Sequence, residues 1–363
     1  MSRVLVVGAG IGGLALAAAL RESGHRVDVA EQARSIEPIG AGIVLHPNGM
    51  AALNALGLAE TVRALGREID TLSISRSGAT IEIRLADVWP EARFPTIAIR
   101  RADVQRALAA RAFDGSEAMR LHLGQQLAAI ELDGRVRFAD GDEDAYDLVV
   151  GADGVHSTVR DACFPESPAL ELDVRYLRFI ASGLPLSDDG VWRTFTNDGS
   201  SSGFIPLGSS RFHCFVQQIS PDGEPIDAAG LDPVMADAYL RREGVPHEGP
   251  TWIMPEHHWR NGACALLGDA AHALSPTFTE GGSLAIEDAV VLARCLEQKA
   301  IVAEAIACYE ALRAPRLAWA ARMSASQLLG LRRPRSDRPL DANLATEYMR
   351  QMYRPLLRDL DQA

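Results

Sequence analysis

Three glycines near the start of the chain, Gly8, Gly10 and Gly13, follow the apolar run 4–7 at the spacing Gly-x-Gly-x-x-Gly. In such a strand-to-helix turn the first glycine makes the tight turn, the second lets backbone N–H groups approach a pyrophosphate, and the third lets the helix pack on the strand. The helix expected over 13–21 directs its positive end at the phosphates. Glu31 closes a second apolar run, where its carboxylate can accept hydrogen bonds from ribose hydroxyls. These residues predict a dinucleotide-binding site.

The elements that must position this site alternate between strand and helix patterns. Downstream of Glu31 we expect a helix over 50–65, a β-hairpin over 71–85, a helix over 101–113, two strands around Asp133-Gly134, a buried strand over 145–150, a β-rich stretch over 170–261 with one helix near 231–243, a buried strand over 263–267, and Ala-rich helices to about 330.

This interleaving predicts an α/β fold with two domains. A Rossmann-type nucleotide-binding domain is expected to be discontinuous, with the parts 1–71, 97–167 and 262–330. A β-rich substrate domain is expected from 72–96 and 168–261, followed by a C-terminal helical segment, 331–363. A small molecule is expected to bind in a cleft between the two domains.

Composition narrows the classes of partner. The net charge of −12 disfavours nucleic acid, whose phosphates attract clustered Lys and Arg. No apolar run approaches the roughly 18 residues that span a bilayer. The glycine motif lies so near Met1 that we expect no signal peptide before it. Five scattered cysteines suit a reduced, cytoplasmic protein, and no residue cluster predicts a metal site.

Two further segments accompany the glycine motif. One is 147–160, which contains Asp153-Gly154, and the other is 266–289, which contains Gly268-Asp269, His272 and Gly281-Gly282. With Pro47-Asn48 and Arg101, these segments make the chain resemble the group A flavoprotein aromatic monooxygenases, the family that includes p-hydroxybenzoate hydroxylase, salicylate hydroxylase and the flavin-dependent urate hydroxylases. The resemblance extends from Arg3 to about Arg316.

The resemblance implies a bound FAD and a transiently bound NAD(P)H. Asp269 would accept hydrogen bonds from ribityl or ribose hydroxyls, and the helix that begins near Gly281 would aim its N–H groups at the flavin O2/N1 side. The full implied FAD-binding set is Gly8, Gly10, Ile11, Gly12, Gly13, Glu31, Gln32, Arg34, Val44, Arg101, Leu127, Asp153, Gly154, Asp269, Pro276, Gly281, Gly282 and Ser283.

The chain departs from the family pattern before this last helix. Relatives usually have Gly-Gln-Gly where this sequence reads Thr279-Glu280-Gly281. Glu280 either places a carboxylate near the flavin rim, which would weaken FAD binding or shift its reduction potential, or faces solvent without a role.

The resemblance also implies hydroxylation of a small aromatic or N-heteroaromatic substrate by O₂ through a flavin C4a-hydroperoxide. Such a reaction gains from a base that deprotonates a phenol-like ring, and histidine suits that role near neutral pH. His213, on one strand face with Phe215 and Gln217, and His46 are the candidates, although either could be purely structural. His272 is more simply a brace of its turn.

Other residues complete the expected substrate site. Thr277 and Phe278 are expected in the wall of the pocket. No arginine stands out as a carboxylate anchor, because Arg193 and Arg211 could equally be surface residues.

Two other functions remain open. The same fold could serve another redox enzyme, a reductase or a halogenase-like protein, although the halogenase Trp-x-Trp-x-x-Pro signature is absent. A non-catalytic flavin-fold binding protein is the second. The choice between NADH and NADPH, the substrate, and the choice between monomer and homodimer are open as well.

Overall fold

The computed structural model describes residues 1–36, 42–332 and 340–353. One half of the molecule is built on a six-stranded sheet with the order β18-β19-β12-β1-β2-β8. All its pairs are parallel except β18–β19. The strands are β1 (Arg3–Val7), β2 (Arg26–Glu31), β8 (Met119–Leu123), β12 (Leu148–Gly151), β18 (Arg260–Asn261) and β19 (Cys264–Leu266).

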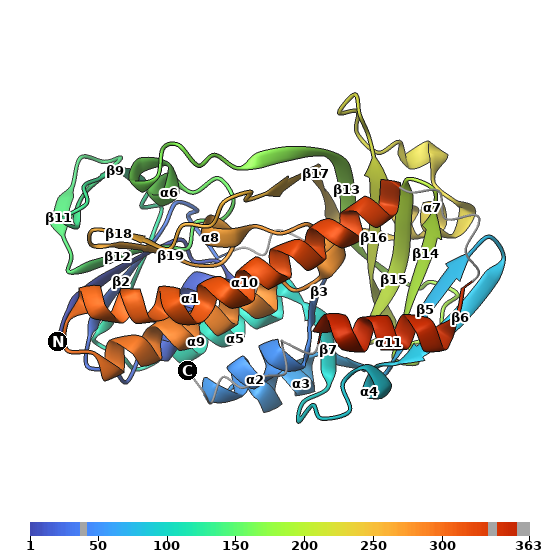
Figure 1. The fold of residues 1–363 in the computed structure, drawn as a ribbon, viewed down its shortest axis with the longest axis horizontal. Coiled ribbons are helices and arrows are strands. Elements are labelled where there is room, and N and C mark those ends of the chain that lie inside the picture. The colour runs from blue at the N-terminus through green and yellow to red at the C-terminus, as the bar shows by residue number, and fades with distance from the viewer. Residues whose placement is uncertain (37–41, 333–339, 354–363) are drawn as a thin grey trace.

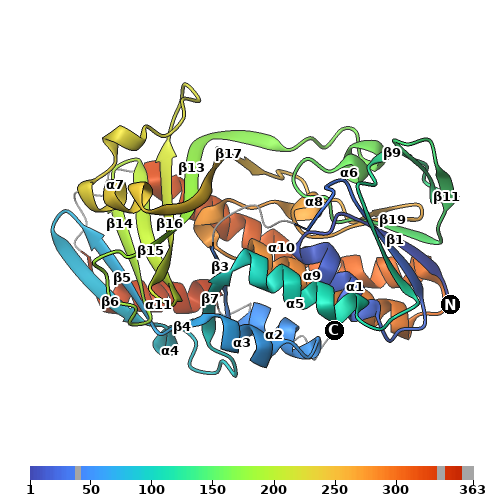
Figure 2. The same cartoon turned by 180° about the vertical axis from the view of Figure 1, so that it is seen from behind.

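Four helices make a layer beside this sheet (Figures 1 and 2). They are α1 (Ile11–Leu20), α5 (Arg101–Phe113), α9 (Gly281–Gln298) and α10 (Val302–Arg332). α1 lies between α5 and α9 and contacts both. Its Ala and Leu side chains are almost all buried, because neighbours pack on several of its faces. The nucleotide motif therefore opens a helix that is fixed from several sides.

The other half is a seven-stranded sheet with the order β17-β13-β16-β15-β14-β5-β6 (Figure 1). Its strands are β5 (Thr71–Arg76), β6 (Ala79–Arg84), β13 (Leu170–Ser182), β14 (Val191–Asn197), β15 (Ser200–Gly208), β16 (Arg211–Ile219) and β17 (Arg242–Ile253). On one face, Phe212, Cys214 and Val216 share a core with Met235 and Ala238 of α7 (Pro233–Leu240). Because side chains alternate along a strand, His213, Phe215 and Gln217 lie on the opposite face.

Two small sheets complete the molecule. One has the order β3-β7-β4 and contacts the seven-stranded sheet through β15 and β16, and the other has the order β11-β10-β9. Their strands are β3 (Gly42–Leu45), β4 (Arg67–Ile69), β7 (Thr96–Arg100), β9 (Leu127–Ile130), β10 (Arg135–Phe138) and β11 (Glu143–Ala145). The short helices are α2 (Pro47–Ala55), α3 (Ala59–Leu65), α4 (Leu85–Val88), α6 (Thr158–Cys163), α8 (Asp269–His272) and α11 (Ala342–Tyr353), with 3₁₀ turns η1 (Ala228–Gly230) and η2 (Pro276–Phe278).

Most expected elements are confirmed. The hairpin turns at Ser77-Gly78, and the helix over 101–113 has the predicted bounds. The single helix predicted over 50–65 is wrong. It is two helices, α2 and α3, because the chain turns at Gly57, whose φ of 73° lies in the left-handed region.

Part of the C-terminal prediction can be compared with the structure. α10 continues to Arg332, and α11 covers 342–353, where Arg350 donates hydrogen bonds to the Asp87 carbonyl. The remaining residues of the predicted segment, 333–339 and 354–363, lie outside the described part of the chain. Among the described helices, none has the length and apolar content to cross a membrane.

Candidate functional site

The glycine motif forms a tight turn at the carboxyl end of β1. Gly8 has a φ of 103°, which favours glycine, and a Cβ at Gly13 would lie 2.0 Å from the Gly8 carbonyl oxygen. Gly10, by contrast, has free space, since a Cβ there would meet nothing nearer than the Ala152 oxygen at 4.0 Å. Ile11 is buried and Gly12 is half-buried at the start of α1. The first N–H groups of α1 are thus presented beside Gly10, as a pyrophosphate requires.

Glu31 is held in place at the end of β2. Its Oε2 accepts a hydrogen bond from the Ala9 N–H and its Oε1 accepts one from the Ala33 N–H, both at 2.8 Å. Each carboxylate oxygen has further lone pairs, so the group can still accept ribose hydroxyls. Gln32 and Arg34 are exposed beside it.

Asp269 and Arg101 are charged residues that each begin a helix and are exposed. Asp269 is exposed at the first position of α8 and has no hydrogen bond or ion pair to any described residue. Its Oδ1 lies 3.7 Å from where a Cβ at Gly281 would stand, at the start of α9. Arg101, the first residue of α5, is also exposed. With Gly10 and Glu31, these groups fit FAD: anion-binding N–H groups, two acceptors for hydroxyls, and a cation.

Asp153 is one of the expected FAD-binding residues, but its carboxylate makes hydrogen bonds within its own turn. Its carboxylate accepts hydrogen bonds from Ser157 Oγ at 2.5 Å and from the Thr158 N–H at 2.7 Å, and burial raises its pKa. The side chain therefore shapes the turn before α6, while Gly154, with a φ of 80°, completes it. Val44 and Leu127 are buried apolar residues.

Two helix N-termini meet next to His46. The His46 N–H donates to Ser283 Oγ at 3.4 Å, and its Nε2 lies 2.9 Å from Thr279 Oγ1. Thr279 has a φ of 55°, a left-handed conformation that the family glycine would adopt without strain. The hydrogen bond to His46 holds the Thr279 side chain in place. Gly282 packs against Ile43 of β3, and Pro276 is half-buried in η2.

Glu280 is fully buried, so the alternative in which it faces solvent is wrong. Its Oε2 accepts a hydrogen bond from Asn48 Nδ2 at 3.1 Å, whereas its Oε1 has no hydrogen-bond partner among the described residues. Burial, with a smaller contribution from the negative charge of Glu287, raises its pKa to about 8. The side chain is therefore a neutral acid at neutral pH.

Behind Glu280 lies a buried charge network that joins α9 to α10. Arg313 donates to Asp288 at 2.6 Å and to Glu287 at 2.8 Å, and Arg316 also binds Glu287. Burial would raise the pKa of Asp288, but His272 and Arg313 outweigh it and hold the value at about 2. His272 Nε2 lies 2.5 Å from Asp288, which also accepts the Gly268 N–H. His272 thus braces its turn, as expected.

The seven-stranded sheet presents the second part of the site. His213 is 7% exposed, and its Nδ1 accepts a hydrogen bond from the Gly42 N–H at 3.2 Å. Burial, and then the positive charge of Arg178, lower its pKa to about 3. The Phe215 ring lies 6.1 Å from the imidazole. Gln217 is buried, and its Nε2 has no hydrogen-bond partner in the described structure.

An aromatic group around His46 was not foreseen from the sequence. The rings of Trp89, Tyr353 and Trp192 lie 5.0, 5.6 and 6.5 Å from the imidazole. Burial lowers the pKa of His46 to about 3. These rings come from three distant segments, so no local pattern could have linked them.

Four further residues were weighed for the substrate site: Thr277, Phe278, Arg193 and Arg211. Thr277 Oγ1 hydrogen bonds with Ser275 Oγ at 2.9 Å in η2, and the Phe278 side chain lies outside what the structure describes. Arg193 is paired with Asp189 and Arg211 with Glu243. These pairs occupy both arginines that were weighed as carboxylate anchors.

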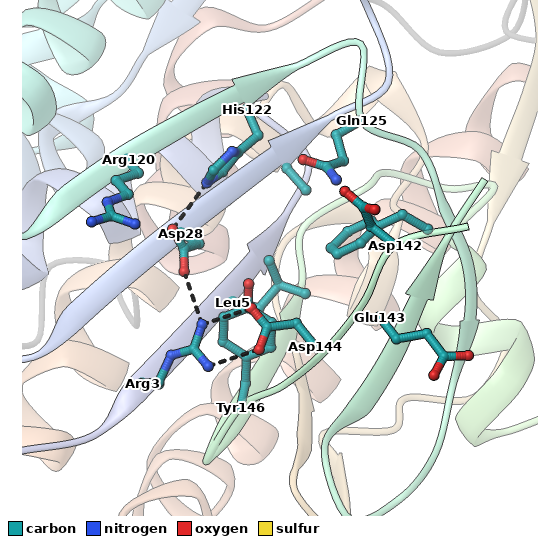
Figure 3. A pocket seen from close by; sticks show the side chains of 12 residues that line it. Arg3, Leu5, Asp28, Arg120, His122, Gln125, Asp142, Glu143, Asp144 and Tyr146 are labelled. Atoms are coloured by element: carbon teal, nitrogen blue, oxygen red, sulfur yellow. Dashed lines mark hydrogen bonds and ion pairs between the residues drawn. The ribbon is translucent and has the colours of Figure 1, made fainter. Parts of the chain in front are cut away.

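A polar recess of about 280 Å³ lies elsewhere, between the six-stranded sheet and β10–β11 (Figure 3). None of the expected site residues lines it. Figure 3 shows its charges turned toward one another: Arg3 binds Asp144, and His122 binds Asp28 at 2.9 Å. We assign it no ligand. Among the described residues, no cluster of His, Cys, Asp and Glu could hold a metal ion.

Comparison with known proteins agrees with this geometry. A family model described as "FAD binding domain" matches residues 1–240 and 250–324. The aurachin C monooxygenase/isomerase of Stigmatella aurantiaca is 34% identical over 343 residues, covering 86% of this chain and 85% of the relative. The 3-amino-4-hydroxybenzoate 2-monooxygenase of Streptomyces cremeus is 32% identical over 335 residues, covering 87% and 84%.

A solved structure shows the same fold. Klebsiella pneumoniae HpxO, crystallised with FAD and uric acid, superposes with a TM-score of 0.81 at 24% identity, covering 98% of this chain and 94% of HpxO. The expected fold class, a Rossmann-type FAD-binding part with a β-rich sheet, is thereby confirmed. With the family match over most of its length, this chain belongs to the group A flavoprotein aromatic monooxygenases and is an FAD-dependent monooxygenase.

Proposed function

We propose that the enzyme uses NAD(P)H and O₂ to hydroxylate a small aromatic or N-heteroaromatic compound held between the seven-stranded sheet and the start of α9. Buried polar atoms without partners carry this proposal. In the described structure, Gln217 Nε2 and Trp192 Nε1 make no hydrogen bond. An unsatisfied buried donor costs about 1–3 kcal/mol, so such donors suit a ligand with ring oxygens or nitrogens.

The pairing of the strands gathers these groups on one face. Ile205 of β15 pairs with His213, so Phe204, the residue before Ile205, lies on the opposite face. Phe204 pairs with Arg193 of β14, and Trp192 precedes Arg193. Trp192 therefore shares a face with His213, Phe215 and Gln217. An aromatic ring that lies against Phe215 would meet polar donors around its edge.

We assign His213 the role of a hydrogen-bond donor to the ring oxygen. Its Nδ1 accepts the Gly42 N–H, so the proton of the neutral ring resides on Nε2. Because its pKa lies near 3, the imidazole is neutral when substrate binds, and it stabilises a phenolate oxygen better than it removes a proton. His46 is the alternative, with a buried Nδ1 that lacks a partner among the described residues.

When bound, the flavin supplies the activation of O₂. The proposal includes the transfer of an oxygen atom from O₂ to the substrate ring, which the family resemblance implies. The FAD-binding residues named from the sequence, from Gly8 to Ser283, keep their proposed roles. Asp153 acts through the turn that it caps. NAD(P)H is proposed to bind transiently. The two-domain boundaries, a cytoplasmic location, and a monomer or homodimer are proposed as well.

An oxidation assay tests this function. FAD-loaded enzyme is mixed with NADH or NADPH and a panel of phenolic acids, hydroxypyridines, hydroxyquinolines and purines, and the loss of nicotinamide absorbance is followed. We expect at least one compound to accelerate the oxidation and to yield a hydroxylated product. Oxidation that no ring compound accelerates, or a product without new oxygen, would contradict the proposal.

A further inference from the structure

Glu280 is a buried acid that directly precedes α9. Its carbonyl accepts the Leu284 N–H at 2.9 Å, so its backbone belongs to the first turn, but its side chain does not cap the helix. The carboxyl is instead turned into the protein and is 0% exposed. Oδ1 of Asp269, an acceptor proposed for FAD hydroxyls, lies 3.7 Å from where a Cβ at Gly281 would stand. Glu280 is therefore one residue away from the surface that is proposed to hold the flavin.

Asn48 joins the Glu280 carboxyl to a second buried carboxyl, Glu287. Its Nδ2 donates to Glu280 Oε2 at 3.1 Å and to Glu287 Oε1 at 3.0 Å. Glu287 is neutralised by Arg313 and Arg316, whereas Glu280 has no ion pair with an arginine or lysine among the described residues. The carbonyl oxygen of a neutral acid is its better acceptor, so the proton of Glu280 resides on Oε1. This atom is buried and has no hydrogen-bond partner in the described structure.

The groups that face Glu280 leave a charge on it poorly compensated. Burial raises the pKa of Glu280 to about 8, the charge of Glu287 adds to this effect, and Arg316 opposes it. His46 Nε2, 4.0 Å from Oε1, is neutral, because burial lowers the pKa of His46 to about 3. Arg313 already pairs with Glu287. Charges interact strongly in a low-dielectric interior, so a further negative charge nearby would hold the proton on Glu280 more firmly.

The flavin would provide such a charge. When bound, FAD gains negative charge at its O2/N1 edge as it accepts a hydride from NAD(P)H. Resting on the proposed placement of that edge beside the start of α9, we propose that Glu280 is a redox-linked proton site of the enzyme. Wherever Glu280 is ionised in the oxidised enzyme, reduction brings one proton from solvent to the carboxylate and forms the Oε1–H bond. Reoxidation removes the flavin charge, and the proton returns to solvent.

The consequence for the cofactor depends on pH. Near neutral pH the protonated acid adds no charge beside the flavin, so it does not oppose reduction. At alkaline pH the carboxylate repels the electrons that the flavin accepts, and the reduction potential falls. A glutamine, which relatives usually have at this position, cannot titrate and would leave out this extra dependence.

The reduction potential of the bound flavin measures the coupling without any substrate. FAD-loaded enzyme is reduced in equilibrium with a reference dye over a range of pH, for the unsubstituted protein and for Glu280→Gln. Below about pH 7 the two potentials should change in parallel, because Glu280 is protonated in both redox states. Above about pH 8 the reduction equilibrium of the unsubstituted protein should fall by up to a further tenfold per pH unit, about 30 mV for a two-electron couple.

Infrared difference spectroscopy observes the proton itself. At about pH 8.5 the reduced-minus-oxidised spectrum of the unsubstituted protein should show a gain of protonated-carboxyl absorbance, and at about pH 6 it should show no net gain. Glu280→Gln should show none at either pH. A purely structural role for Glu280 would not produce this signal. Because the unsubstituted protein is measured by itself, the test remains decisive if Glu280→Gln loses FAD.

Glu297→Gln is the matched control, because it removes an exposed glutamate from the far end of the same helix. Its potential and its infrared signal should follow those of the unsubstituted protein at every pH. Equal pH dependence of the potential in the unsubstituted protein and in Glu280→Gln would overturn the inference, as would a carboxyl signal that is absent from the unsubstituted protein or persists in Glu280→Gln.

Failure of the proposed function gives a different pattern. The redox-linked proton would then be measured although no ring compound is hydroxylated. Conversely, hydroxylation by an enzyme whose potential has the same pH dependence as that of Glu280→Gln would leave the proposed function standing. That result would place the charge of the reduced flavin out of reach of Glu280 and so contradict only the inference.

Discussion

Glu280→Gln is expected to change how the stability of the protein depends on pH. The carboxyl is fully buried, and its pKa is raised from the ordinary 4.5 to about 8, mainly by burial. His46 Nε2 lies 4.0 Å from Oε1 but is neutral, because burial lowers its own pKa to about 3. No nearby cation therefore offsets the burial of a charge at Glu280, apart from a contribution of Arg316.

The direction follows from proton binding. Between pH 4.5 and about 8 the unfolded chain has an ionised Glu280 while the folded protein keeps it protonated. The folded state then binds more protons, so its stability falls as the pH rises. At about 1.4 kcal/mol per pKa unit, the loss between about pH 5 and pH 8.5 is roughly 4 kcal/mol. Glutamine keeps an oxygen for the Asn48 hydrogen bond and has no charge to bury.

Urea unfolding of the flavin-free protein at about pH 5, 7 and 8.5 measures this difference. The free energy of unfolding of Glu280→Gln, relative to the unsubstituted protein, should rise by roughly 4 kcal/mol from the lowest to the highest pH. Other groups titrate equally in both proteins and cancel. Glu117→Gln, at an exposed glutamate, should show no such rise. Parallel pH profiles for Glu280→Gln and the unsubstituted protein would refute the reasoning.

Three further predictions concern the cofactor and the substrate. Gly10→Val should fold normally but purify without FAD, because the space beside Gly10 is open to a side chain while the pyrophosphate needs it; a yellow variant would contradict this. Asp269→Ala should weaken FAD binding by about 1–3 kcal/mol, measured by flavin fluorescence on titration of the flavin-free protein, and unchanged affinity would exclude a hydrogen bond to the cofactor. His213→Ala should retain FAD but lower the hydroxylation rate by about 10²–10³-fold, the scale for losing a positioned donor, with more H₂O₂ released per NAD(P)H; a loss in His46→Ala alone would assign the role to His46.

The sequence alone was sufficient to predict those elements whose structure is determined by residues close together in the chain. The turn at Gly8, the hairpin at Ser77-Gly78 and the helix over 101–113 all follow from residue types and periodicity within a few positions. The same reasoning missed the break at Gly57. Its signal was present, since a glycine past the end of a helix commonly adopts a left-handed conformation.

The site depended on contacts that no local pattern encodes. Glu280 could be identified as unusual, but its hydrogen-bond partner Asn48 lies 232 residues away in the sequence. Arg178 alternates regularly with Leu177 and Phe179, but no local pattern showed which face of β13 lies toward the site. Adjacent acids in the apolar helix α9, Glu287 and Asp288, were a signal that buried cations must lie nearby.

Oxygen labelling tests the central claim most directly. FAD-loaded enzyme is incubated with NAD(P)H and an accepted ring compound under ¹⁸O₂ in ordinary water, and the product is analysed by mass spectrometry. We predict that each product molecule contains one ¹⁸O atom on the ring and that no product forms without oxygen. A product whose new oxygen comes from water, or one that forms equally without O₂, would contradict the assignment as a monooxygenase acting on an aromatic ring.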